Sequence, residues 1–190
     1  MDIKRPFMIF LSFFLITSLI GCEKTTNEFY TTLVGENNTY CFRGLTKQMS
    51  WEDVVAKENI DTTKVKPSLF KDYEYQEPIY FEELGTSFLR GYAFTVDNKL
   101  SEAEYVYYSN NKEELDGLMI KIGNIMEKTA KKLKIKPDVG SIEEIKSPLM
   151  YYSSDSEKVT KWEHKAQDGS MLIIWAVPKM VRIIVRYSSL

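Results

Sequence analysis

The hydrophobic residues between positions 111 and 137 recur at steps of three and four, the spacing of one face of an α-helix. Asn111 can cap the start of this helix, and Pro137 stops it. The stripe could lie on a membrane or pack on a sheet, and the absence of Trp and Phe from it favours the sheet. Its members are Leu115, Leu118, Met119, Ile122, Ile125, Met126, Ala130 and Leu133.

A shorter helix is predicted from Trp51 to about Glu58. Ser50 is a favourable N-cap, and Asp53 stands three residues later, as in a capping box. Polar residues dominate positions 59–72 and 137–147, so both segments are expected to be loops.

Alternating apolar and polar positions predict the strands. Residues 171–177 are apolar throughout, which predicts a central strand buried on both faces. The predicted strands are residues 39–44, 73–82, 88–96, 102–108, 149–153, 158–166, 171–177 and 180–187.

This order of elements predicts an α+β fold, an antiparallel sheet of about six to eight strands with two helices packed on it. The order helix-then-meander occurs twice, which suggests a tandem pseudo-repeat. Through residues 42–44 (FRG) and 49–54 (MSWEDV), the chain resembles β-lactamase-inhibitor-protein-like modules and the small lipoprotein of the outer-membrane barrel assembly machinery. No functional residue is carried over from this resemblance.

The first residues have the pattern of an export signal. Lys4 and Arg5 precede uncharged residues 7–20, a stretch too short for a transmembrane helix of about 20 residues. Residues 19–22, Leu-Ile-Gly-Cys, resemble the lipobox of bacterial lipoproteins. The resemblance implies cleavage before Cys22, a lipid on its sulfur, and a domain anchored to the cell membrane or outer membrane outside the cytoplasm. The alternative is an ordinary signal peptide that leaves Cys22 unmodified.

The predicted domain organisation follows from this signal. Residues 1–21 form the lipoprotein signal peptide, 22–28 the lipidated cysteine and its tether, and 29–190 one globular domain. Without residues 1–21 the net charge of −2 becomes −3, which argues against a nucleic-acid partner. Cys41 then has no partner for a disulfide within the chain and is expected to be a buried apolar residue.

The sequence offers little for catalysis. His164 is the one histidine, so it would have to serve any nucleophile–base arrangement, and too few His and Cys residues exist for a zinc site. We therefore expect no catalytic residue, no metal and no cofactor. Paired carboxylates leave an alternative, a cell-wall or glycan-processing enzyme; they are Glu82-Glu83, Glu113-Glu114 and Glu143-Glu144.

Tyrosines are more numerous than one core face requires, and aromatic surfaces suit ligand and protein contacts. The simpler alternative is that most of them are half-buried residues of the sheet. The leading hypothesis is a lipid-anchored binding or interaction protein whose partner is an envelope protein or a glycan. The candidate binding surface comprises Tyr73, Tyr75, Tyr80, Tyr105, Tyr107, Tyr108, Tyr151 and Tyr152.

Overall fold

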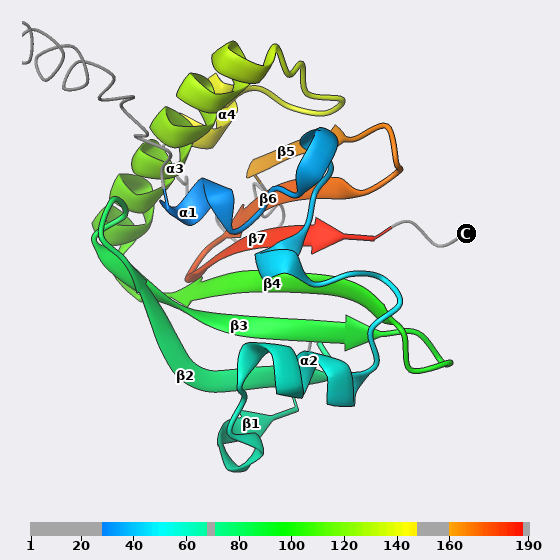
Figure 1. The fold of residues 1–190 in the computed structure, drawn as a ribbon. Helices are drawn as coiled ribbons and strands as arrows, with labels where there is room; N and C mark the ends of the chain where they lie inside the picture. Colours follow the sequence, from blue (N-terminus) through cyan, green and yellow to red (C-terminus); the bar gives the residue numbers. More distant parts are fainter. Residues whose placement is uncertain (1–27, 68–70, 148–159, 188–190) are drawn as a thin grey trace, which may run out of the picture.

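The computed structural model describes residues 28–67, 71–147 and 160–187. In these residues the chain has the predicted α+β fold, a seven-stranded antiparallel sheet with helices (Figure 1). The helices are α1 (Glu28–Thr31), α2 (Trp51–Glu58), α3 (Lys112–Leu133) and α4 (Ile142–Lys146), and the 3-10 turns are η1 (Glu36–Asn38), η2 (Phe42–Gly44) and η3 (Thr62–Lys64). The strands are β1 (Val65–Lys66), β2 (Tyr73–Phe81), β3 (Thr86–Phe94), β4 (Leu100–Tyr108), β5 (Thr160–Lys165), β6 (Met171–Val177) and β7 (Met180–Arg186).

The sheet consists of two meanders joined side by side. Strands β2, β3 and β4 form one meander and β5, β6 and β7 the other. Strand β4 pairs with β7, which gives the order β1-β2-β3-β4-β7-β6-β5 (Figure 1). The last described strand, β7, therefore lies inside the sheet.

The prediction that residues 171–177 form the central strand is wrong. Strand β6 lies between β7 and β5, one place from the edge of the sheet. Its apolar run arises because both of its faces are buried, with Leu172 and Ile174 on one face and Ile173 on the other. Burial on both faces does not require a central position.

One face of the sheet carries the main core. The apolar stripe of α3 shares this core with Ile174 of β6 and with Val181 and Ile183 of β7, so the predicted packing of the helix on the sheet is confirmed. Ile122 is fully buried. Ser50 caps α2 and forms the predicted capping box with Asp53.

Helix α4 lies in the segment that the sequence predicts to be a loop. Ser141 and Glu144 form a capping box at its start, and Ile145 is buried. The helix packs closely on α3 at Gly123, where an added Cβ would lie 2.5 Å from the Cγ of Lys146. Five residues are too few to show a periodic pattern of apolar positions, so the sequence does not reveal α4.

Residues 28–45 form a segment that we call the N-terminal strap. It crosses the sheet in front of β6, β7 and β4 (Figure 1). Its backbone is bound to distant side chains: the Tyr40 N–H donates to Ser170 Oγ at 2.8 Å, and the Phe42 N–H donates to the Tyr187 hydroxyl at 3.1 Å. The strap thus connects the start of the described chain to β7 and to the β5–β6 turn.

The strand predicted at residues 39–44 is therefore wrong. Arg43 and Gly44 have φ angles of 50° and 75°, and this left-handed backbone ends any extended run. Residues Phe42–Gly44 form a 3-10 turn instead, and Val34 and Tyr40 form an isolated bridge. The predicted strand at residues 149–153 lies outside the described residues.

The second face of the sheet carries a buried ionic network. Glu104 on β4 is 1% exposed and lies 2.7 Å from the guanidinium of Arg182 on β7. Burial raises the pKa of Glu104, while the positive charges of Lys71 and Arg182 oppose that rise. Gly91 on β3 makes room for this carboxylate, since a Cβ there would lie 2.8 Å from Glu104 Oε1.

Candidate functional site

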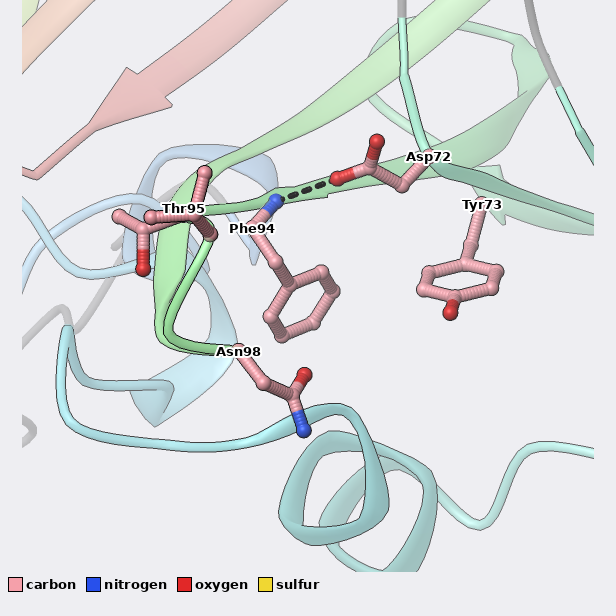
Figure 2. A pocket seen from close by; sticks show the side chains of 6 residues that line it. Asp72, Tyr73, Phe94, Thr95 and Asn98 are labelled. Carbon is pink, nitrogen blue, oxygen red and sulfur yellow. Dashed lines mark hydrogen bonds between the residues drawn. The ribbon is translucent and has the colours of Figure 1, made fainter.

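A surface hollow of about 440 Å³ lies where β2 begins and the β3–β4 hairpin turns, close to the start of α2 (Figure 2). This volume falls in the range of small-molecule sites, about 300–1,000 Å³. We call it the aromatic hollow. Its lining residues are Asp72, Tyr73, Phe94, Thr95, Val96 and Asn98.

Two aromatic rings form adjoining walls of the hollow. The rings of Tyr73 and Phe94 have centroids 5.8 Å apart and planes at 70°, so they meet at a corner. Trp51 on α2 stacks on Tyr73 with a centroid distance of 4.0 Å and an interplanar angle of 13°. Trp51 is not a lining residue, so it supports the wall from outside the hollow.

The hairpin turn is held to α2 by Asn98. Its Oδ1 accepts a hydrogen bond from the Trp51 N–H at 3.3 Å, and its Nδ2 donates to Glu52 at 3.2 Å. Asn98 has a φ of 54°, a conformation that asparagine tolerates better than most residues. These bonds fix the turn that carries the hollow relative to the helix that supports Tyr73.

Negative charge surrounds the hollow. Asp72 lines it, and one of its carboxylate oxygens accepts a hydrogen bond from the Phe94 N–H at 2.6 Å (Figure 2). Exposed Asp97 lies between two lining residues, and exposed Glu52 bonds to Asn98. Lys99 is the basic residue nearest along the turn, and its Nζ donates to the Gln48 carbonyl at 3.1 Å.

Val96 is the most exposed large hydrophobic residue of the hollow. It is fully exposed at the turn and lines the hollow. An apolar side chain in that position gains nothing for the folded domain alone, because it removes no apolar surface from water. The hollow therefore combines aromatic walls, an apolar rim and a carboxylate.

The structure separates the tyrosines that the sequence assigns to one binding surface. Tyr75 and Tyr105 are 3% and 0% exposed in the core, so their assignment to a surface is wrong. The Tyr75 hydroxyl accepts a hydrogen bond from the Asp61 N–H at the start of η3, and the Tyr105 hydroxyl donates to Thr32 of the N-terminal strap.

The other predicted tyrosines occupy different places. Tyr73 lines the aromatic hollow, and half-buried Tyr107 packs against the core and donates to Glu114 at 3.3 Å. Tyr80 and Tyr108 are exposed on β2 and β4, but neither lines the hollow. Tyr151 and Tyr152 lie outside the described residues, as does Cys22.

Members of the three carboxylate pairs lie in helix first turns or accept a hydrogen bond from the backbone. Glu113 and Glu114 occupy the first turn of α3, and Glu143 and Glu144 the first turn of α4, where the helix dipole favours negative charge. Glu83 accepts a hydrogen bond from the Phe29 N–H at the start of the strap. Within residues 28–67, 71–147 and 160–187, no group of three or more His, Cys, Asp and Glu side chains could hold a metal ion.

His164 is bound to the strap. Its Nδ1 lies 2.6 Å from the hydroxyl of Tyr40, and the two rings meet edge to face with centroids 5.6 Å apart. Burial lowers the pKa of His164 and raises that of Tyr40. Both shifts favour the neutral pair, which suits a hydrogen bond that holds the strap on β5.

No family model, curated protein or solved structure matches this chain. In the part of the chain that the structure describes, no helix is both long and apolar enough to cross a membrane.

Sequence patterns identify only part of the hollow, Tyr73 among its lining residues. Trp51 is recognised only as the start of a helix, and Phe94 only as a strand residue. One local signal was present: Asn98 in a turn directly after an aromatic strand end. The positions of Asp72 and Trp51 beside that turn depend on contacts between segments more than twenty residues apart in the chain, at Asp72–Phe94 and Trp51–Asn98.

Proposed function

We propose that this protein is a non-catalytic binding protein, held at the outer side of a bacterial membrane by a lipid on Cys22, and that the aromatic hollow is its binding site. The observation that carries the proposal is the corner formed by Tyr73 and Phe94 beside an exposed carboxylate. The lipobox resemblance supports the anchor. Glu28, where α1 begins, is six positions after Cys22, so this tether spans at most about 20 Å.

The stacking of Trp51 on Tyr73 supports the choice of this site. A ligand that enters the hollow meets a wall held by a second ring and by the bonded hairpin turn, so binding has little conformational entropy to overcome. The other exposed tyrosines, Tyr80 and Tyr108, lack such support in the described contacts between rings.

We also propose that the chain is a tandem pseudo-repeat. The sheet order supports this, because β2-β3-β4 and β7-β6-β5 are two meanders of opposite order that join at β4 and β7. Helix α2 precedes the first meander, and α3 with α4 precede the second. The hollow would then belong to the first half alone.

Photo-cross-linking in intact cells tests the binding site. The photoreactive residue p-benzoylphenylalanine replaces Val96, which is exposed at the hollow, or Tyr80, which is 61% exposed away from it. We expect irradiation to give a defined adduct from position 96 and none from position 80. Equal adducts from both positions, or no adduct from position 96, would contradict the proposal.

A further inference from the structure

We propose that the aromatic hollow recognises an organic ammonium ion, a ligand class that deepens and rests on the binding function proposed above. Three properties of the hollow favour a cation: the electrostatics of its aromatic walls, the sign of the surrounding charge and the chemistry of its polar groups.

The walls favour a cation because an aromatic face carries negative charge density. A cation near the face of a Tyr or Phe ring gains about 0.5–2 kcal/mol. Trp51 covers one face of Tyr73 and lies nearly perpendicular to Phe94, with 5.9 Å between centroids and an interplanar angle of 81°. The other face of Tyr73 is therefore the ring face that a cation in the hollow can contact, with Phe94 beside it.

The charge around the corner has the matching sign. Asp72 lines the hollow, Asp97 lies on its turn, and Glu52 binds the lining residue Asn98. Lys99 is the basic residue on the same turn, and its ammonium group is directed to the Gln48 carbonyl. The carboxylates therefore outnumber the cations along these segments, and an anionic ligand would be repelled.

The donor set selects an organic cation over a metal ion. Metal ions such as Ca²⁺ need six to eight oxygen ligands. The hollow offers Asp72, the amide of Asn98 and the hydroxyl of Thr95, and the carboxylate and the amide are already engaged in hydrogen bonds. An ammonium ion with methyl or methylene groups needs fewer polar partners and can bury its apolar surface against the rings and Val96.

Calorimetry with the full-length protein in a detergent without choline tests the inference. The probes are choline, its uncharged isostere 3,3-dimethyl-1-butanol, and the neutral sugar N-acetylglucosamine. We expect choline to bind about 10-fold more tightly than the isostere, in keeping with the strength of a cation–π contact. We expect N-acetylglucosamine not to bind.

Two variants and their matched controls connect this binding to the hollow. Asp72→Asn removes the charge but keeps an acceptor for the Phe94 N–H, and Phe94→Leu removes a ring but keeps apolar bulk. We expect each to weaken choline binding several-fold. Exposed Glu82→Gln and exposed Tyr80→Leu should leave it unchanged, and thermal melting verifies that every variant is folded.

The outcomes separate this inference from the proposed function. Equal binding of choline and its isostere, no binding of choline, or binding of N-acetylglucosamine alone would overturn the ammonium assignment. Any of these results leaves the cross-linking experiment at Val96 to decide whether the hollow is a binding site at all.

Discussion

At the scale of single residues, Glu58 at the end of α2 is held on the core face by two arginines. Its carboxylate is 3% exposed and accepts hydrogen bonds from two arginines. Arg43 Nε lies 2.9 and 2.7 Å from its two oxygens, and Arg90 Nη1 lies 2.7 Å from one of them. Arg90 also lies over the ring of Tyr75, with 4.7 Å between its Cζ and the ring centroid. One carboxylate therefore joins α2, the strap and β3.

Replacing Glu58 by Gln should destabilise the domain strongly. The change leaves two largely buried guanidinium groups without their counter-charge, and loss of one partner from a buried ion pair costs about 3–5 kcal/mol. We expect a loss near 3 kcal/mol, because Arg43 keeps some contact with solvent and Gln keeps one acceptor. Urea unfolding measures the free energy, with exposed Glu82→Gln as the control. Equal stability of the two variants would show that Glu58 is not needed to balance the arginines.

At the scale of elements, the periodic apolar pattern of α3 predicts which of its side chains are buried. Its sequence stripe is buried in the core at Leu115, Leu118, Met119, Ile122, Ile125 and Met126. Lys128 on the same helix is exposed. The helix therefore presents one apolar side to the sheet and leaves its charged side in solvent.

Ile122→Ala should lower the stability of the domain by about 2–5 kcal/mol, because it leaves a cavity under a fully buried side chain. Lys128→Ala should change it by less than about 0.5 kcal/mol. Thermal unfolding of both variants gives the comparison. An unchanged melting temperature for Ile122→Ala together with weaker binding to lipid vesicles would mean that the stripe contacts a membrane.

The sequence predicted the elements whose pattern is long and local: α2 with its cap, α3, and strands β2, β3, β4, β6 and β7. It failed for the strap, because alternation at residues 39–44 cannot reveal the left-handed backbone of Arg43 and Gly44. It also failed for the hollow, whose residues come from β2, the β3–β4 turn and the start of α2. Register and turn geometry bring these segments together, and neither is encoded in a local window.

At the scale of the whole molecule, both sides of the sheet carry features that partly cover its edge in the described residues. On β5, Glu163 exchanges backbone hydrogen bonds with Val139 at 3.0 and 3.3 Å. On β2, the two-residue strand β1 covers Glu74 and Tyr75, and Pro78 further along has no N–H to offer. Edges of this kind resist pairing with strands of other chains.

The proposed anchor gives a whole-molecule prediction. Cys22→Ser removes the sulfur that would carry the lipid, so the protein should leave the membrane fraction or remain as an uncleaved precursor. Cys41→Ser is the matched control and should stay in the membrane, because Cys41 belongs to the strap and donates to the Leu45 carbonyl at 3.1 Å. Cell fractionation and the mass of the N-terminal peptide measure both. A wild-type N-terminus without lipid mass would contradict the anchor.

The place of β7 inside the sheet has a consequence for the order in which the molecule can form. The strand bridges the two meanders, and Tyr187 just beyond it binds the strap near the start of the described chain, 145 residues away. Such long-range pairings form slowly. The loop between the two paired segments must first close, and the chain entropy lost in closing it is offset only when the contacts have formed. Until Met180–Arg186 has been synthesised, the chain lacks the strand that joins its halves. The two meanders should therefore be unable to complete their common sheet, or to bind the strap through Tyr187, before β7 has left the ribosome.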